Sequence, residues 1–480
     1  MRNEIRFLLG NEPRVLRSVD PTRTVLDYLR QEEGLVGTKE GCNEGDCGAC
    51  TVVLARPHDG ALRYSAVNAC IQFVPTLDGC QLLTVEHLAS GDTLHPVQQA
   101  MVDHHGSQCG FCTPGFVMAL FALTKDGKSL SEDKTINDGL AGNLCRCTGY
   151  KPIAQAAKAL EGVEDPLENR SDDVLLALQQ MTDDETIAAT DAAGRAHYAP
   201  TSLETFTALL ADHTEATISA GSTDVGLWVT KDMQQPKTVI YTGRVRELLE
   251  ISSDENEITI GAAATYTDAA GILARHYPDM GEVIRRIGSP QIRNAGTIGG
   301  NVANGSPIGD MPPMLIAAGA RVHLASAGGK RSMPIEDFFI DYGKQDLEPG
   351  ECVEKITVPV PNKGLRFAAY KLSKRFDQDI SAVLGAFAFR LDGTIITEAR
   401  IAFGGMAATP KRAPTAEAAL TGNALDEATV QAAMKALRKD FTPISDMRAS
   451  KVYRLYSATN LLWRAYLEIA EPSVETRLVG

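Results

Sequence analysis

Eight of the ten cysteines form two groups before residue 150, and their spacing suits metal binding. The first group has the pattern C-x4-C-x2-C at Cys42, Cys47 and Cys50, followed by a distant Cys70. Four thiolates in this order are typical of a plant-type 2Fe-2S site. Zinc also binds four thiolates, but it favours two short-spaced pairs, whereas three of these cysteines share one loop. The first group therefore predicts an iron–sulfur cluster.

The second group combines a C-x2-C pair, Cys109 and Cys112, with a C-x-C pair, Cys145 and Cys147. Pro114 suits the first turn of a helix, so the first pair is expected at a helix start. Taken alone, this group fits zinc and iron–sulfur equally well. Because it follows a plant-type site, it favours a second 2Fe-2S cluster, since two clusters in series form an electron conduit.

Short strands and one helix are predicted around the first group. Thr22 or Thr24 can cap the helix, whose apolar positions continue through Leu29. Strands separated by turn residues are expected at Ile5–Leu9, Arg14–Val19, Thr51–Ala55 and Leu62–Val67. This order of elements predicts a small ferredoxin-like β-grasp domain that presents Cys70 just past a strand end.

Length and composition exclude several classes of protein. The 480 residues suit about three or four domains, and a net charge of −14 argues against a nucleic-acid surface, which needs clustered Lys and Arg. No apolar run approaches the ~20 residues of a membrane helix, and the N-terminal residues do not read as a signal peptide. We therefore expect a cytoplasmic protein, where clustered cysteines bind metal rather than form disulfides. Cys80 and Cys352 are expected to be plain buried thiols.

The acidic segment 161–198 is interpreted as a linker with one short helix at Asp173–Met181, and a glycine-rich turn follows it. After a predicted strand at 216–220, this turn consists of Ile218, Ser219, Ala220, Gly221, Ser222, Thr223, Asp224, Val225 and Gly226. It lacks the lysine of a P-loop and the GxGxxG pattern, and a plain strand-to-helix turn is the alternative. Its small residues nevertheless let backbone N–H groups approach a pyrophosphate.

A second glycine-rich segment runs from Ala295 to Asp310. It contains too many glycine, hydroxyl and amide groups for an ordinary core element, yet Ile298 and Val302 attach it to a core. Its backbone can approach a ligand closely, and its polar side chains suit a ribityl chain and a pyrophosphate. The segment therefore predicts a ligand cradle.

The chain from Gly41 to Gly149 resembles the iron–sulfur portion of the molybdenum hydroxylases, the xanthine dehydrogenase and aldehyde oxidase group. The resemblance rests on the eight cysteines, on Cys-Gly-Phe-Cys-Thr-Pro-Gly at 109–115 and on Leu-Cys-Arg-Cys-Thr-Gly-Tyr at 144–150. It implies that Gln108 contacts the pterin of a molybdenum cofactor, and support of the cluster loop alone is the alternative. Both glycine-rich segments resemble the FAD-binding loops of the same family, which belong to a fold of the vanillyl-alcohol oxidase type.

That resemblance also implies the residues that bind FAD. Asp310, Thr297 and Asn301 would hold its polar tail, and Lys371 would complete the site. Ile287 would lie near the flavin ring, where the family often has an aromatic residue. The other implied FAD-binding positions are Ala295, Gly299, Gly300, Asn304 and Ser306. By the same resemblance the loop 374–380 borders the flavin where NAD docks, and a solvated charged loop is the alternative.

The chain beyond residue 365 predicts a small α+β domain, with strands at 382–390 and 395–403 and helices at 415–420, 427–441 and 448–470. The predicted fold class is therefore multi-domain α+β. Its parts are a β-grasp 2Fe-2S ferredoxin domain (1–85), a helical 2Fe-2S domain (86–160), the linker (161–198), a vanillyl-alcohol-oxidase-type FAD-binding domain (199–375) and a C-terminal α+β flavoprotein domain (376–480).

The resemblance implies an electron-transfer subunit, the small chain of a two-chain bacterial enzyme of the xanthine dehydrogenase branch. Electrons would pass from a large molybdopterin-binding subunit that oxidises hypoxanthine and xanthine, through both clusters and FAD, to NAD+. No stretch remains to house the molybdenum cofactor, so we expect it on that partner, in a heterotetramer of two small and two large chains. The alternatives are the equivalent subunit of an aldehyde- or carbon monoxide-oxidising enzyme, and a non-catalytic iron–sulfur protein. Neither nucleic acid nor a membrane is an expected partner.

Overall fold

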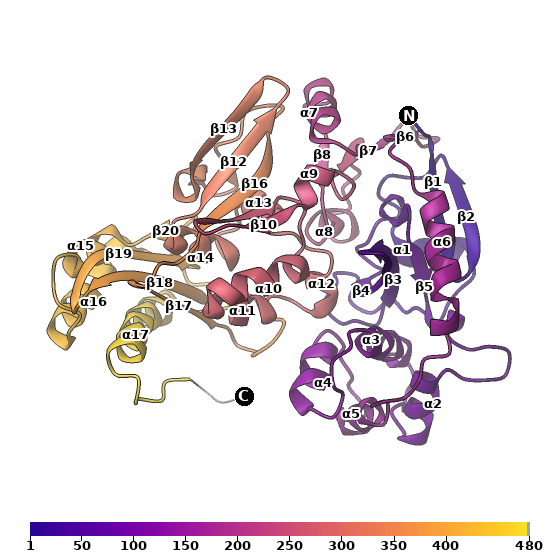
Figure 1. The fold of residues 1–480 in the computed structure, drawn as a ribbon, viewed down its shortest axis with the longest axis horizontal. Coiled ribbons are helices and arrows are strands. Elements are labelled where there is room, and N and C mark those ends of the chain that lie inside the picture. Colours follow the sequence, from indigo (N-terminus) through magenta and orange to yellow (C-terminus); the bar gives the residue numbers. More distant parts are fainter. Residues whose placement is uncertain (478–480) are drawn as a thin grey trace. The chain divides into compact units, whose positions relative to one another are not determined.

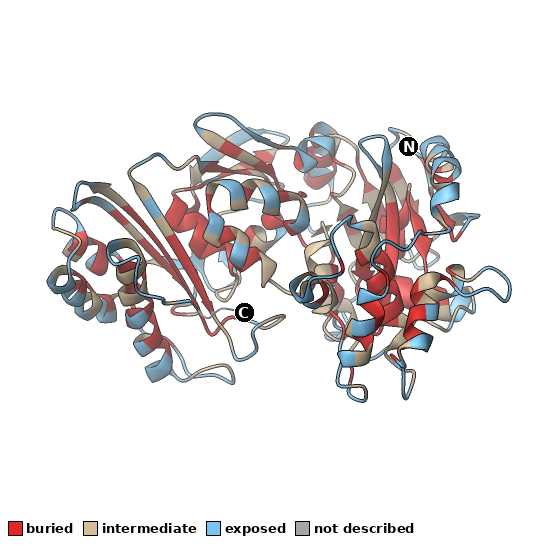
Figure 2. Cartoon of the chain, turned by 60° about the horizontal axis from the view of Figure 1, so that its bottom comes forward, coloured by how far each residue is buried: buried red, intermediate tan, exposed pale blue. Residues whose placement is uncertain are grey.

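The computed structural model describes residues 1–477, which form two compact units. The first unit consists of Met1–Arg246 and Gly288–Gly296, and the second consists of Glu247–Ile287 and the residues from Thr297 onward. The last residues of the predicted C-terminal domain, 478–480, lie outside the described residues. Most elements of each unit are labelled in Figure 1. Strands are largely buried, whereas exposed residues lie mainly on loops and on the outer faces of helices (Figure 2).

The first unit begins with a five-stranded sheet in the order β2-β1-β5-β3-β4. Its strands are β1 (Glu4–Leu9), β2 (Glu12–Arg17), β3 (Thr51–His58), β4 (Ala61–Asn68) and β5 (Gln81–Leu83). Two-residue turns close both hairpins, and Gly10, Asp59 and Gly60 have the positive φ that such turns require. Thr24 caps α1 (Val25–Asp27) as predicted, and β1 pairs with β5 in parallel. These features confirm the expected ferredoxin-like sheet.

Four helices follow this sheet: α2 (Pro96–Asp103), α3 (Thr113–Lys125), α4 (Asp133–Leu140) and α5 (Lys151–Lys158). Every residue of α3 from Gly115 to Leu123 is buried, the pattern of a helix surrounded by packing on all sides. Pro114 lies in its first turn, as the sequence predicted. Cys112 therefore sits at the start of the central helix of this part of the unit.

The predicted linker is more ordered than expected. The helix α6 (Ser171–Met181) packs Val174 and Leu178 against Leu8 of β1, which confirms the short helix. The strands β6 (Ile187–Thr190) and β7 (Ala196–Ala199) then enter a sheet in the order β6-β7-β9-β8. The composition was misleading because most of the acidic side chains are exposed, while small residues such as Ala189 and Ala199 face inward.

The first unit is completed by α7 (Leu203–Asp212), β8 (Thr217–Ser219), α8 (Val225–Thr230), β9 (Thr238–Tyr241) and the short α12 (Pro290–Arg293). Ser202 caps α7 by accepting a hydrogen bond from the Thr205 N–H, as predicted. The strand β8 leads directly into the first glycine-rich turn, and α8 begins within it. The helix α12 belongs to the segment Gly288–Gly296 that returns to this unit from the second.

His197 in β7 is buried, and neither of its ring nitrogens has a hydrogen-bond partner. Burial lowers the pKa of His197 to about 4 from its ordinary 6.5, and the charge of Asp78 opposes this shift only in part. Between these two pH values the unfolded chain binds a proton that the folded chain does not. The stability of the first unit should therefore fall as the pH drops through this range.

We expect His197 to account for about 2 kcal/mol of lost stability between pH 7.5 and pH 5. In His197→Phe this part of the loss should disappear, because phenylalanine binds no proton in either state. The measurement is the urea-unfolding free energy of both proteins at the two pH values. An equal pH dependence in both would show that another group is responsible.

The second unit contains a five-stranded antiparallel sheet in the order β10-β11-β16-β12-β13. Its strands are β10 (Ile251–Ser253), β11 (Glu257–Gly261), β12 (Arg321–Ser326), β13 (Gly329–Pro334) and β16 (Cys352–Pro359), and a small hairpin pairs β14 (Phe339–Asp341) with β15 (Lys344–Gln345). The accompanying helices are α9 (Arg246–Leu249), α10 (Tyr266–His276), α11 (Pro278–Arg285), α13 (Ile298–Asn304) and α14 (Met311–Ala318). The second glycine-rich segment thus folds as α13 and the turn that leads into α14.

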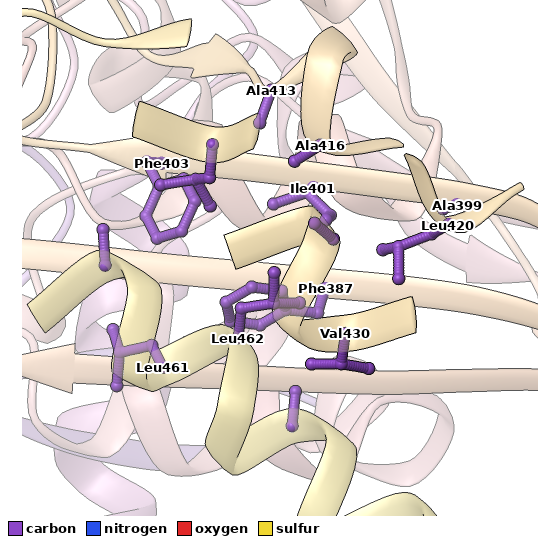
Figure 3. Close-up of a cluster of buried hydrophobic side chains, with 14 of the residues drawn as sticks. Phe387, Ala399, Ile401, Phe403, Ala413, Ala416, Leu420, Val430, Leu461 and Leu462 are labelled. Carbon is purple, nitrogen blue, oxygen red and sulfur yellow. The ribbon is translucent and has the colours of Figure 1, made fainter. Parts of the chain in front are cut away.

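The C-terminal part of this unit is a four-stranded antiparallel sheet covered by helices. The strands, in the order β17-β18-β19-β20, are β17 (Leu365–Leu372), β18 (Val383–Asp392), β19 (Ile395–Gly404) and β20 (Lys411–Arg412). The helices are α15 (Pro414–Leu420), α16 (Glu427–Asp440) and α17 (Lys451–Ala470). Phe387 and Phe403 of the sheet pack against Val430, Leu461 and Leu462 of the helices (Figure 3). The predicted hairpin after Asp392 and all three predicted helices are confirmed.

Within residues 1–477, the structure has no helix whose length and apolar character would suit a membrane span.

Candidate functional site

The four cysteines of the first group converge at one end of the ferredoxin-like sheet. The sulfur of Cys42 is hydrogen-bonded to those of Cys47 and Cys70, and the sulfur of Cys70 is also hydrogen-bonded to that of Cys50. Backbone N–H groups of Asp46 and Cys47 donate to the Cys42 sulfur, each at 3.3 Å. Hydrogen bonds from Cys47 and Cys70 lower the pKa of Cys42. The same hydrogen bonds raise the pKa of Cys47 and Cys70, so the shifts do not favour thiolate across the whole group.

Glycines let the cysteine loop close around these sulfurs. A Cβ atom on Gly41 would lie 2.7 Å from the Cys47 sulfur, and Gly45 and Gly48 both have positive φ. Cys50 and Cys70 are buried, whereas Cys42 and Cys47 are partly exposed. Four thiols with backbone donors aimed at one sulfur fit a 2Fe-2S cluster, whose potential depends on such hydrogen bonds.

The second group is more open to solvent. Cys112 and Cys145 are hydrogen-bonded to each other, as are Cys109 and Cys147. Burial raises the pKa of Cys112 to about 12, whereas Cys109 and Cys147 are exposed. Thr148 donates to the Cys145 sulfur from its backbone N–H at 3.4 Å. Four sulfurs from two loops again fit a cluster, here at the surface of the unit.

The two groups are joined by a hydrogen bond between their loops. The backbone N–H of Leu144, the residue before Cys145, donates to the carbonyl oxygen of Cys47 at 3.0 Å. The loops approach so closely that a Cβ on Gly48 would lie 2.2 Å from the Gly142 carbonyl oxygen. A Cβ on Gly115 of α3 would also lie 2.2 Å from the carbonyl oxygen of Gly48. Spacing within each group could not reveal this contact, because it joins residues about 95 positions apart.

The first glycine-rich turn lies in the same unit as both cysteine groups. Ser219 and Ser222 are buried and share a hydrogen bond of 2.9 Å, and Ser222 has a positive φ. A Cβ on Gly221 would lie 1.7 Å from the Ala295 carbonyl oxygen, so this turn crosses the start of the second segment. A Cβ on Gly226 would lie 2.7 Å from the Cβ of Ile71, the residue after Cys70. The turn therefore packs directly against the segment that carries Cys70 of the first cysteine group.

Gly221→Ala should lower the FAD content and destabilise the first unit by about 1–3 kcal/mol, because the added methyl group overlaps the Ala295 backbone. The matched control is Gly271→Ala in α10, where a Cβ meets nothing within 4 Å and the helix should gain up to about 1 kcal/mol. Thermal unfolding and released flavin per chain are measured for both. Full flavin in Gly221→Ala would contradict a role for this close approach.

The second glycine-rich segment belongs to the second unit from Thr297 onward. Thr297 caps α13 by accepting a hydrogen bond from the Gly300 N–H at 3.0 Å. A Cβ on Gly299 would lie 2.4 Å from the Ala262 Cα, which explains why glycine is needed there. The side-chain oxygen of Asn301 is buried without a hydrogen-bond partner, so it remains available to a ligand. Ser306 is partly exposed, and Asn304 is exposed.

Asp310 and Lys371 form a buried ion pair in this unit, and Ser381, which the sequence analysis missed, joins them. Lys371 donates to Asp310 and, at 3.0 Å, to the Ser381 hydroxyl oxygen. The Ser381 hydroxyl donates to the other Asp310 oxygen at 2.5 Å. All three side chains are buried. This network brings together the two charged residues that were predicted to bind FAD, although 61 positions separate them in the chain.

The loop 374–380, which was predicted to border the flavin where NAD docks, is hydrogen-bonded to Arg286 at the end of α11. The guanidinium of Arg286, which precedes Ile287, donates to the carbonyl oxygens of Phe376 at 3.0 Å and Lys371 at 3.2 Å. It also lies 4.2 Å from the centre of the half-exposed Phe376 ring. Gln378 in this loop has a positive φ. Specific contacts therefore hold the loop, although residues 374–376 and 380 are exposed.

The predicted flavin residues are divided between the units. The turn 218–226 and Ala295 belong to the first unit, whereas Thr297, Gly299, Gly300, Asn301, Asn304, Ser306, Asp310, Ile287 and Lys371 belong to the second. The outlying cysteines behave as expected, since Cys80 and Cys352 are both buried. The cysteines of the first unit match the ligand sets of two iron–sulfur clusters. The first glycine-rich turn in the first unit, and the segment with the partnerless Asn301 oxygen in the second, each taken within its own unit, have features that suit part of a flavin dinucleotide.

Comparison with protein families assigns a domain type to most of the chain. Residues 9–74 match the 2Fe-2S iron–sulfur cluster binding domain, and residues 84–158 match a second 2Fe-2S binding domain. Residues 192–361 match the FAD binding domain in molybdopterin dehydrogenase, and residues 368–469 match the CO dehydrogenase flavoprotein C-terminal domain. These matches define an iron–sulfur flavoprotein.

Similar proteins and similar solved structures show which iron–sulfur flavoproteins this chain resembles. The chain is 32% identical to the xanthine dehydrogenase of Drosophila pseudoobscura pseudoobscura over 100% of its own length and 40% of that protein. A carbon monoxide dehydrogenase from Hydrogenophaga pseudoflava, lacking the Mo-pyranopterin moiety of its cofactor, is 32% identical with a TM-score of 0.54. That match covers 56% of this chain and 94% of the other. Quinoline 2-oxidoreductase from Pseudomonas putida 86 gives 28% identity and a TM-score of 0.53, over 58% and 97% of the two chains. The chain belongs to the molybdenum hydroxylase family.

Proposed function

We propose that this chain is the small, electron-transfer subunit of a xanthine dehydrogenase. Electrons would enter from a molybdopterin-binding large subunit that oxidises hypoxanthine and xanthine, and would leave through FAD to NAD+. The chain spans about 40% of the length of the curated xanthine dehydrogenase that it matches, and we propose that the molybdenum cofactor is bound by a large partner chain. We further propose a heterotetramer of two small and two large chains, in the cytoplasm, where reduced thiols prevail.

The observation that carries this proposal is the order of contacts within the first unit. The loop of the second cysteine group is hydrogen-bonded to the loop of the first, from the Leu144 N–H to the Cys47 carbonyl oxygen. The segment that carries Cys70 of the first group in turn contacts the glycine-rich turn, through Ile71 and Gly226. Both cysteine groups and the first flavin-type turn therefore form one continuous series, as electron transfer over short steps requires.

The outer end of this series is suited to a partner protein. Phe111, Leu144 and Tyr150 are 48%, 41% and 43% exposed around the second cysteine group. Large apolar side chains at a surface, with Cys109 and Cys147 exposed among them, are typical of a protein–protein contact. Gln108 is exposed beside them, which supports its proposed contact with a pterin on the partner.

We propose that the cysteines bind two 2Fe-2S clusters, one held by Cys42, Cys47, Cys50 and Cys70 and the other by Cys109, Cys112, Cys145 and Cys147. When bound, FAD supplies the exchange between single electrons and a hydride. The glycine turns would accommodate its pyrophosphate, Asn301 would donate or accept at its polar tail, and Ile287 would contact its ring. The ranges of the two 2Fe-2S family matches support the proposed boundaries at about residues 85 and 160. The two flavoprotein matches begin at residues 192 and 368, earlier than the proposed starts of those domains at 199 and 376.

The first experiment measures iron, zinc and released flavin in one purified sample, together with its visible spectrum. We expect about four irons and one FAD per chain, and bleaching of the visible bands when NADH is added. Iron with no flavin would favour a non-catalytic iron–sulfur protein. Zinc without flavin would mean that both cysteine groups are structural.

The alternative substrate class rests on the structural match to carbon monoxide dehydrogenase. That solved chain aligns along 94% of its length with only 56% of this chain, so this chain carries additional domains. The fusion of both cluster domains to the flavin domains favours the xanthine branch. Assays of the complex with xanthine, aldehydes and carbon monoxide distinguish the branches. Turnover of carbon monoxide or aldehydes without xanthine oxidation would overturn this choice.

A further inference from the structure

We propose that Gln291 is a positioning residue that holds the loops of the two cysteine groups in fixed register. Gln291 lies in α12, on the segment Gly288–Gly296 that returns to the first unit between the two parts of the second. Its side chain is only 1% exposed. The inference rests on the proposed function, because its consequence concerns the clusters that these loops would hold.

The amide of Gln291 contacts one residue from each cysteine loop. Its nitrogen donates to the Thr51 hydroxyl oxygen at 3.1 Å and to the Asn143 side-chain oxygen at 2.9 Å. Thr51 directly follows Cys50, and Asn143 precedes Cys145 by two positions. A single NH2 group therefore bridges the first group to the second.

Asn143 and Thr51 extend this bridge to a third point, the carbonyl oxygen of Gly48. The Asn143 nitrogen donates to this oxygen at 3.0 Å, and the Thr51 hydroxyl donates to it at 2.6 Å. Asn143 also donates to the Thr51 hydroxyl at 3.2 Å. All three side chains are buried, so the bonds are shielded from water and hold both loops rigidly.

The Gln291 amide packs closely against Gly142, where no side chain larger than hydrogen would fit without moving it. A Cβ on Gly142 would lie 1.8 Å from the Gln291 side-chain oxygen, and all three of its nearest neighbours would be atoms of the Gln291 amide. That oxygen has no hydrogen-bond partner, so Gln291 acts in this network only as a donor. Outer groups that orient metal-binding loops tune the site without touching the metal. Gln291 should therefore affect both clusters from outside their cysteines.

The test compares Gln291→Met with Gln81→Met in the full chain. Methionine keeps the length of the side chain but removes the donor. Gln81 is a buried glutamine on β5 that donates to the Gly10 carbonyl oxygen at 2.9 Å, away from both cysteine groups. Iron content, thermal stability and low-temperature EPR spectra of the dithionite-reduced proteins are recorded. Freeze-quenching after NADH addition gives the rate at which electrons reach the second cluster.

In Gln291→Met we expect full iron, changed EPR line shapes and magnetic splitting for both clusters, and about tenfold slower electron arrival at the second cluster. Gln81→Met should keep the wild-type spectra and rate, even if its stability falls. Wild-type spectra and rate in Gln291→Met, with iron present, would overturn the inference and leave the proposed function intact. Absence of iron from the wild-type chain would instead overturn the proposed function and this inference with it.

Gly142→Ala provides a second variant in case Gln291→Met fails to fold. The three atoms nearest to the added methyl group all belong to the amide at the end of the Gln291 side chain, so the substitution acts first on that amide. It should reproduce the spectral changes and the slower rate. Normal spectra in a folded, iron-loaded Gly142→Ala chain would overturn the inference.

Discussion

Cys147→Ser is expected to stop xanthine-dependent NAD+ reduction by the assembled enzyme while FAD stays bound and NADH-dependent dye reduction continues. The change removes one of the four thiolates at the exposed, outer end of the series. The loss should exceed the roughly 10–100-fold that follows removal of an outer group around a metal site. Turnover with xanthine and with NADH plus a dye is measured on the same sample, with iron and flavin contents.

The control for this prediction is Cys80→Ser. Cys80 is fully buried outside both groups, and its sulfur donates to the Leu77 carbonyl oxygen at 2.9 Å, a bond that a serine hydroxyl can replace. Both activities and the iron content should remain at the wild-type level in this variant. Intact xanthine-to-NAD+ turnover in Cys147→Ser would show that electrons do not pass through the second cysteine group.

Asp310→Ala is expected to release most of the FAD and to destabilise the second unit by roughly 3–5 kcal/mol, because it leaves the buried charge of Lys371 without its carboxylate partner. Loss of flavin and loss of stability must therefore be separated. The measurements are released flavin per chain and the free energy of unfolding. Stoichiometric flavin in Asp310→Ala would contradict the proposed role of Asp310.

The double variant Asp310→Ala/Lys371→Met makes this separation. Removal of both charges eliminates the unpaired lysine, so much of the lost stability should return. Flavin content should stay low, since neither charged group is present to bind the cofactor. If flavin binding returned together with stability, Asp310 would act only through the fold and its assignment to the FAD site would be wrong.

Local sequence determined much of the fold because the relevant interactions span only a few residues. Thr24 and Ser202 cap helices through a hydrogen bond three positions ahead, and Asp59-Gly60 forms its turn with its own neighbours. The linker at 161–198 was misjudged because β7 buries only a histidine and an alanine, His197 and Ala199, and gains its order from pairing with β9, about 40 positions away.

For the candidate sites, the sequence by itself determined which residues have the chemistry, and the tertiary structure decided which of them meet. The cysteine spacing is a local property, so both groups could be recognised without coordinates. Ser381 beside Asp310, and Gln291 beside Thr51 across 240 positions, could not be recognised in this way. A lone glutamine or serine has no spacing pattern, and its role arises only when folding buries its polar atoms beside distant partners that must satisfy them.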